Sequence, residues 1–134
     1  MSNDFVEIEE RVRYAETDRM GVAHHSNHLI WFEMGRSEFC RRKGLPYSEI
    51  EKSGYSLVVV EIFCRYKKPL KYEQKFLIRT YLEELNNKKA KFKYELINHE
   101  DSTIIAEGYS IHVVTNSEGK SSTLPDGILH RLKN

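Results

Sequence analysis

The chain has 134 residues, of which 40% are apolar and 31% are charged, and its formal net charge is +1. This length is typical of one domain with a sizeable buried core, so we expect a single domain over residues 1–134. The near-neutral charge argues against a general nucleic-acid binder, and no apolar run approaches the roughly 20 residues that span a bilayer.

The N-terminal sequence and the cysteines indicate the compartment. The stretch MSNDFVEIEE is acidic and lacks the basic-then-apolar pattern of a secretion signal. The two cysteines, Cys40 and Cys64, are not spaced as metal ligands. These features predict a cytoplasmic protein with two reduced thiols, and nothing in the composition calls for a cofactor.

The first predicted element is a strand over residues 5–14, where apolar and polar residues alternate. Four residues would share one face of this strand: Val6, Ile8, Val12 and Tyr14. A polar loop follows over residues 15–26.

A long helix is predicted next, over residues 27–43, because apolar residues recur there at helical spacing. The residues expected on its buried stripe are Leu29, Phe32, Arg36, Phe39, Cys40 and Lys43. Ser26 and Asn27 are good capping residues for its start. Gly44 and Pro46 mark its end, since glycine suits the left-handed C-terminal position and proline cannot continue a helix.

Four strands joined by short turns complete the chain. They are predicted over residues 55–66, 74–85, 89–98 and 103–115. Gly108 lies inside the last strand, where a glycine costs stability, so we expect the helix to pack closely against it. The β-α-β-β-β-β order predicts an α+β fold, in which a five-stranded antiparallel sheet packs on one long helix. Because one helix cannot cover five strands, a second copy of the chain is expected to cover the rest.

The polar loop carries Asp18, followed by Gly21, which allows a sharp bend, and by His25 at the predicted helix start. Two interpretations of Asp18 stay open. An aspartate at this place can accept backbone hydrogen bonds in an Asx turn. It can also act as a base or nucleophile, and a helix N-terminus at His25 would stabilise an oxyanion nearby. The second interpretation predicts hydrolysis of an acyl compound.

A zinc site is the competing interpretation of the histidines. His24 and His28 are four residues apart, with His25, Asp18 and Glu16 close in sequence. However, a helix that begins after His24 removes the shared helical face, and the chain has no HExxH or Cys/His cluster. We therefore predict no metal site.

A resemblance to a known family is carried by YAETDRMGVAHHSNHLIWFEMGRSEF and supported by RYKKPLKYEQ and GKSSTLP. The pattern Tyr-x-x-x-Asp-x-x-Gly, then His-Ser-Asn and an aromatic-rich helix, resembles the 4-hydroxybenzoyl-CoA thioesterase-like acyl-CoA thioesterases of the hotdog fold. The resemblance covers about residues 7–125. It implies a sheet wrapped around the helix, a homodimer or homotetramer with sites at the subunit interface, and an acyl-CoA substrate.

The resemblance also implies roles for individual residues. Asp18 would be the catalytic carboxylate, the backbone N–H of His25 would hold the thioester oxygen, and Tyr14 would act beside them. For substrate binding we expect contributions from Gly21, Val22, Asn27, Lys67, Lys68, Lys88 and Lys89. The lysines would hold the phosphates of coenzyme A, although a solvated basic face is the more ordinary explanation of each lysine group. Glu33 and Arg36, three residues apart on the helix, are expected to form a structural ion pair.

Two residues depart from the family pattern. His24 and His28 stand where the family often has aromatic residues, commonly tyrosine, so the preference for an acyl group is open.

Two alternative functions remain. A hydratase or dehydratase of the same fold is one alternative, but the helix region lacks a His-plus-acid motif of that kind. A non-catalytic module that binds acyl-CoA or an acyl-carrier protein is the other, but binding alone gains nothing from a carboxylate beside a thioester.

Overall fold

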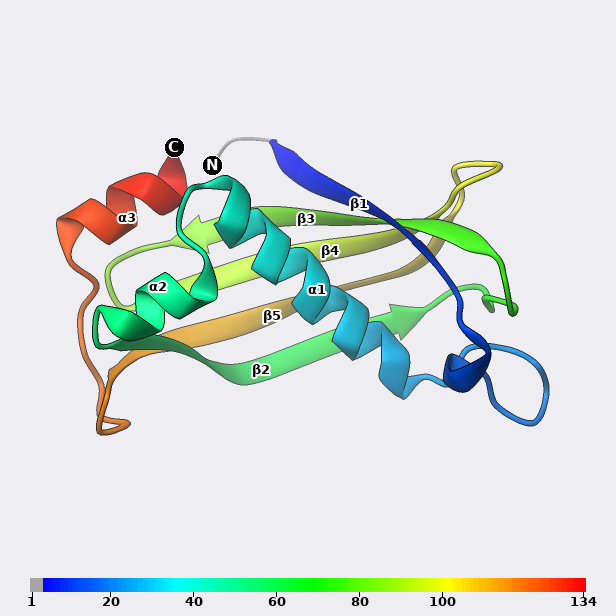
Figure 1. Cartoon of the computed structure of the whole chain (residues 1–134), viewed down its shortest axis with the longest axis horizontal. Helices are drawn as coiled ribbons and strands as arrows, with labels where there is room; N and C mark the ends of the chain where they lie inside the picture. Colours follow the sequence, from blue (N-terminus) through cyan, green and yellow to red (C-terminus); the bar gives the residue numbers. More distant parts are fainter. Residues whose placement is uncertain (1–3) are drawn as a thin grey trace.

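A five-stranded antiparallel sheet and one long helix form the framework of the protein (Figure 1), in a computed structural model that describes residues 4–134. The strands are β1 (Phe5–Arg11), β2 (Tyr55–Tyr66), β3 (Lys75–Leu85), β4 (Lys89–Asn98) and β5 (Ile104–Asn116). The helices are α1 (Ser26–Arg42), α2 (Tyr47–Lys52) and α3 (Asp126–Lys133), with a 3-10 turn η1 (Tyr14–Glu16). Residues 1–3 of the acidic N-terminal stretch lie outside the described residues, and the single-domain assignment stays a prediction.

The strand order in the sheet is β1-β3-β4-β5-β2, and every neighbouring pair is antiparallel. Helix α1 lies across one face of this curved sheet (Figure 1), so the predicted hotdog arrangement and its β-α-β-β-β-β order are confirmed. Helices α2 and α3 were not predicted from the sequence. Each is a short helix that begins directly after a proline, Pro46 or Pro125, whose fixed φ suits a helix start.

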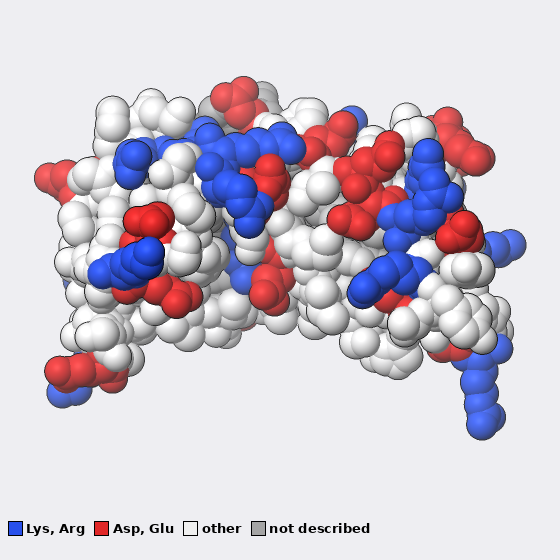
Figure 2. Space-filling view, viewed as in Figure 1, with Lys and Arg blue, Asp and Glu red and all other residues white. Residues whose placement is uncertain are grey.

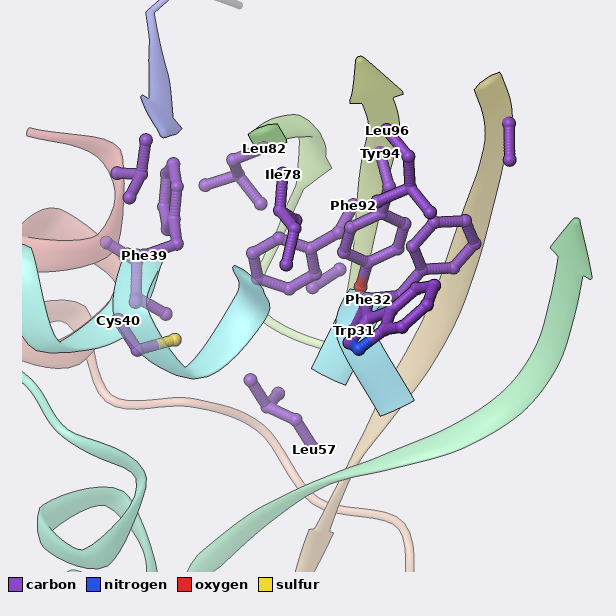
Figure 3. Close-up of a cluster of buried hydrophobic side chains, with 14 of the residues drawn as sticks. Trp31, Phe32, Phe39, Cys40, Leu57, Ile78, Leu82, Phe92, Tyr94 and Leu96 are labelled. Atoms are coloured by element: carbon purple, nitrogen blue, oxygen red, sulfur yellow. The ribbon is translucent and has the colours of Figure 1, made fainter. Parts of the chain in front are cut away.

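The core lies between α1 and the sheet. Figure 3 shows Trp31, Phe32 and Phe39 of α1 directed toward side chains of the sheet. The Phe32 ring stacks on the Tyr94 ring of β4, with centroids 4.5 Å apart. The buried stripe of α1 consists of His28, Trp31, Phe32, Gly35, Arg36, Phe39 and Cys40. The predicted stripe therefore lacked three members and wrongly included Leu29 and Lys43, which are half-buried.

Gly108 of β5 is a point of close packing, as the sequence predicted. A Cβ atom there would lie 2.0 Å from the Phe63 carbonyl oxygen of β2 and 2.8 Å from Cε2 of Phe32 on α1. The helix is therefore one of two elements that approach this glycine, and the backbone of β2 is the nearer one. On the helix itself, Gly35 allows a similar approach to Thr80 of β3.

The first strand ends earlier than predicted. Strand β1 ends at Arg11, and the chain turns away from the sheet through η1, which is closed by the bond from Glu16 N–H to the Arg13 carbonyl. Val12 is still buried, but the side chain of Tyr14 is 77% exposed. The prediction that Tyr14 shares a buried strand face was therefore wrong.

The start of α1 also differs from the prediction. Ser26 and Asn27 lie inside the first turn, and the residue before the helix is His25, whose side chain makes no capping bond. The ring of His24 takes over this role, because its Nδ1 accepts the N–H of Ser26 at 3.2 Å. A ring nitrogen can cap a helix when the preceding loop holds it over the free N–H groups.

A buried polar network replaces the ion pair that was predicted between Glu33 and Arg36. Glu33 is exposed, whereas Arg36 is buried and its Nη1 donates to the Tyr94 hydroxyl at 3.2 Å. The network continues from Tyr94 to Ser110 and on to Nε2 of His112. The ion pair was wrong because the guanidinium turns into the core rather than along the helix surface. Burial lowers the pKa of His112 to about 4.

Both cysteines are free thiols, as expected. Burial raises the pKa of Cys40 to about 11, so this thiol is unreactive. Among the described helices, none combines the length and the apolar character that a membrane crossing requires.

Substituting Gly108→Ala should destabilise the protein, because the new Cβ would overlap the Phe63 carbonyl oxygen. We expect the free energy of unfolding to fall by about 3 kcal/mol, measured by urea denaturation. Gly127→Ala in α3 is the matched control, since a Cβ atom added there would meet no other atom within 4 Å. An unchanged unfolding midpoint for Gly108→Ala would contradict the close approach of β2.

Candidate functional site

The loop between β1 and α1 is fastened to the helix by Glu16. Its buried carboxylate accepts the Arg13 backbone N–H at 2.8 Å and the Trp31 Nε1–H at 3.1 Å. Its backbone carbonyl accepts the N–H of His24 and the side-chain amide of Asn27, both at 2.8 Å. A buried carboxylate is tolerated only when donors surround it in this way. Glu16 therefore holds both ends of the loop against the first turns of α1.

Asp18 lies at the exposed tip of this loop. Its Oδ1 accepts the N–H of Met20 at 2.8 Å and, more weakly, the N–H of Val22 at 3.4 Å. Gly21 closes the turn with a φ of 79° and donates its N–H to the Asp18 carbonyl at 3.0 Å. The Asx-turn interpretation thus describes what Oδ1 does. Within residues 4–134 no partner is found for Oδ2, which leaves one carboxylate oxygen available for chemistry.

The N-terminus of α1 faces the same region. Among the described residues, no acceptor is found for the backbone N–H of His25, which is the type of free donor that a helix start presents. The ring of His24 stacks on that of His25 with centroids 4.1 Å apart. The side chain of Asn27 binds the carbonyls of Glu16 and His24, so in this chain it serves to hold the loop.

A hollow of about 340 Å³, here called the reactive hollow, brings several predicted residues together. It is lined by Asp18, Val22, Ala23, His25, His28, Tyr66, Lys67, Lys68, Pro69 and Leu70. A second hollow, of about 580 Å³, shares Asp18 with the first and is lined by Tyr14, Ala15, Thr17, Asp18, Arg19 and Gly21. Tyr14 and Gly21 therefore line a hollow with Asp18, but not the one that His25 lines.

The lysines predicted to bind phosphate fall into two separate places. Lys67 and Lys68 line the reactive hollow, and both backbone N–H groups donate to the Ile105 carbonyl. The Nζ of Lys67 also lies 3.0 Å from a carboxylate oxygen of Glu107. Lys88 and Lys89 lie at the turn between β3 and β4, at the opposite end of the sheet from the loop of Asp18 (Figure 1). One chain does not bring these two pairs together.

Tyr66, at the end of β2, is a site residue that sequence reasoning missed. Its hydroxyl donates to the His25 carbonyl at 2.8 Å, and its ring lies edge-on to that of His28 at 4.7 Å. Burial and the neighbouring Cys64 raise the pKa of Tyr66 to about 12, so the hydroxyl keeps its proton. Tyr66 lies within the segment RYKKPLKYEQ that supported the family resemblance, but no local spacing relates it to His25, which is 41 residues away.

His28 is a second site residue whose contacts the sequence did not predict. The sequence singled it out only as a departure from the family pattern. Its ring is buried and packs against Trp31, with centroids 5.0 Å apart. Burial lowers the pKa of His28 below its ordinary value of 6.5, against the carbonyls of His25 and His24, which raise it. The ring is therefore neutral at pH 7.

The described residues contain no group of three or more His, Cys, Asp or Glu side chains placed to hold a metal ion. What the reactive hollow does contain is a carboxylate at one side and a free helix N–H at another. Such a pair can polarise a carbonyl oxygen and supply or activate an oxygen nucleophile.

Known proteins resemble this chain in sequence, and solved structures resemble it in fold. YneP of Bacillus subtilis (strain 168), provisionally named an acyl-CoA thioesterase, is 38% identical over 107 residues, covering 80% of this chain and 77% of that protein. The crystal structure of the hypothetical protein AQ1494 from Aquifex aeolicus matches with a TM-score of 0.88 and 35% identity, over 95% of this chain and 98% of that chain. The structure of a DHNA-CoA thioesterase from Staphylococcus aureus matches with a TM-score of 0.84 and 30% identity, over 89% and 80% of the two chains.

A family model extends the match to nearly the whole sequence. The model of the thioesterase-like superfamily covers residues 12–132, which include the loop, α1 and all strands after it. The chain therefore belongs to the thioesterase-like superfamily.

Proposed function

We propose that the protein is an acyl-CoA thioesterase, which hydrolyses a coenzyme A thioester to a free acid and coenzyme A. The observation that carries this proposal is that Asp18 and the N-terminus of α1 at His25 line one hollow. Membership of the thioesterase-like superfamily and the names of YneP and the Staphylococcus aureus enzyme support it.

In the proposed reaction the backbone N–H of His25 donates to the thioester carbonyl oxygen, and the positive end of the helix dipole stabilises the charge that develops there. Asp18 acts through Oδ2, the oxygen that the turn leaves unbound. It either attacks the carbonyl carbon, giving a mixed anhydride that water then cleaves, or removes a proton from an attacking water. In both routes the C–S bond breaks and the thiolate of coenzyme A leaves.

The remaining site residues are proposed to bind the substrate. Lys67 and Lys68, at the rim of the reactive hollow, suit the phosphates of coenzyme A. Val22 would contact the acyl group, and Gly21 would keep the turn open for it. Tyr14 would act from the second hollow, which Asp18 also lines.

We also propose that the protein works as a homodimer or homotetramer in which a second copy covers β2. This edge strand exposes Val58, Val59, Val60, Ile62, Phe63 and Tyr66. In Figure 2 the lower edge of the molecule, where Figure 1 draws β2, is mostly white, which means that few charged side chains lie there. Few charges therefore oppose a contact with a second copy along this edge. Lys88 and Lys89 would reach a reactive hollow only from such a second copy. Location in the cytoplasm stays a prediction.

The test of the reaction is thiol release from a panel of acyl-CoA thioesters by the native protein and by Asp18→Asn. The asparagine retains an oxygen that can accept the N–H groups of Met20 and Val22, so the turn should persist while the carboxylate is lost. We expect kcat/KM to fall by about 10²- to 10⁴-fold. Label from ¹⁸O-water in the Asp18 carboxylate after a single turnover would indicate the anhydride route.

Asp101→Asn is the matched control for this substitution. Asp101 is also an exposed aspartate whose Oδ1 accepts a backbone N–H two residues on, from Thr103, but it lies outside the reactive hollow. Its substitution should leave thiol release unchanged. Full activity in Asp18→Asn would overturn the proposed mechanism, and the absence of thiol release from any thioester would favour a binding module.

Tyr66→Phe should lower kcat about fivefold with little change in KM, because it removes one hydrogen bond to the turn that carries the proposed oxyanion donor. The phenyl ring keeps its packing on His28, so the hollow should keep its shape. Steady-state kinetics check this result. Tyr81→Phe, which removes the hydroxyl bond to Glu95 on the sheet, is the control. Equal kinetics for Tyr66→Phe and the native protein would contradict the positioning role.

Val60→Asp should dissociate the proposed oligomer, because it places a carboxylate on the exposed apolar edge of β2. Analytical ultracentrifugation should give two or four chains for the native protein and one chain for the variant. Ser117→Asp, in the exposed turn after β5, adds the same charge elsewhere and should leave the mass unchanged. A native protein that sediments as a single chain at micromolar concentration would refute this part of the proposal.

A further inference from the structure

The ring of His28 forms part of the wall of the reactive hollow. The residue is only 4% exposed, and its ring is held from two sides, by Trp31 of α1 and by Tyr66 of β2. The orientation of the ring is therefore fixed by packing on both sides.

The two ring nitrogens of His28 differ, since Nδ1 is fully buried and Nε2 is not. No hydrogen bond from Nε2 is found within residues 4–134. The carbonyls of His24 and His25, on the helix side of the ring, raise its pKa. The nitrogen that a ligand in the hollow can reach is therefore Nε2, and an accessible ring nitrogen without a protein partner in the wall of a hollow points to a ligand partner.

The other buried histidine of the protein provides the comparison. His112 has a partner for each ring nitrogen: Nε2 contacts the Ser110 hydroxyl at 2.7 Å, and Nδ1 lies 3.3 Å from the Leu57 carbonyl oxygen. The core thus satisfies a histidine that serves the fold alone. His28 differs in that it lies against open space.

The neutral ring of His28 carries one donor and one acceptor, whichever tautomer it adopts. A hydroxyl group can match Nε2 in either tautomer, because it both donates and accepts. His25 and His28 line the same hollow, one turn of helix apart. A hydroxyl that reaches the His28 ring while the carbonyl oxygen is held by the His25 backbone N–H would therefore lie close to the thioester carbon.

We propose that His28 is a specificity-determining residue, which selects acyl groups with a hydroxyl two or three bonds from the thioester carbonyl. The proposal rests on the proposed thioesterase function, since it takes the carbonyl to be held at the N-terminus of α1. Lys67 and Lys68 would bind the other end of the substrate and would not contribute to this choice.

The test compares matched pairs of thioesters: 3-hydroxybutyryl-CoA against butyryl-CoA, and 2-hydroxybenzoyl-CoA against benzoyl-CoA. The native protein should favour the hydroxylated member of at least one pair by about tenfold in kcat/KM, the value of one good hydrogen bond. In His28→Phe this ratio should fall to about one, while cleavage of the unsubstituted thioester continues. His28→Asn, which keeps a donor and an acceptor, should restore part of the preference.

Two further measurements keep the outcomes distinct. His130→Phe, on the exposed face of α3, changes the same residue types away from the hollow and should leave the ratio unchanged. If the native protein cleaves none of the four thioesters, calorimetric binding of the same pairs still tests His28, while the wider acyl-CoA panel decides the thioesterase proposal separately. A native protein without a hydroxyl preference in kcat/KM or in Kd, or a preference that His28→Phe retains, would overturn the inference.

Discussion

The buried carboxylate of Glu16 is the contact on which the geometry of the site depends. A carboxylate can stay buried only when strong donors surround it, and here the Arg13 backbone and the Trp31 indole provide them. The bond to Trp31 joins the loop to a buried side chain of the helix. Because Asp18 follows two residues later, the distance between its carboxylate and the helix start is set by this anchor. Loss of the Glu16 contacts would release the loop without touching either reactive group.

The sheet holds the start of α1 from two sides. The Trp31 ring packs on Phe76 of β3, with centroids 4.6 Å apart, and Tyr66 of β2 binds the His25 carbonyl. In the sheet, β3 and β2 are separated by β4 and β5, so the first turn of α1 is fixed against elements that are not neighbours. The geometry of the reactive hollow is thus a property of the whole curved sheet, and the close approach at Gly108 contributes to it by bringing β2 near the helix.

The sequence predicted the framework well because periodicity and turn chemistry act over a few residues. The long helix, the four later strands and the glycine at a close contact could all be recognised in this way. The predictions that failed mostly concern contacts between residues that lie far apart in the sequence. Arg36 binds Tyr94, which is 58 residues away, so the nearby Glu33 was the wrong partner. Glu16 acts through Trp31, 15 residues on, and appeared in the sequence only as a conceivable metal ligand.

The candidate site was partly accessible from the sequence for the same reason. Asp18 and His25 belong to one short segment, so their joint position in a hollow could be anticipated. The contribution of Tyr66 could not, because it depends on where β2 ends relative to the helix. Nor could the state of His28, since an unpaired ring nitrogen is defined by the absence of neighbours in space. The roles of these residues in catalysis and specificity stay proposals.

The turn around Asp18 also has a practical consequence for labelling the protein. Met20 supports the carboxylate with its backbone N–H alone, while its side chain is 86% exposed. Exchange of that side chain for a thiol that carries a fluorophore would leave the bond to Oδ1 intact. Such a dye would stand two residues from Asp18 and would report the arrival of a ligand through its emission, without any change to the groups that line the reactive hollow.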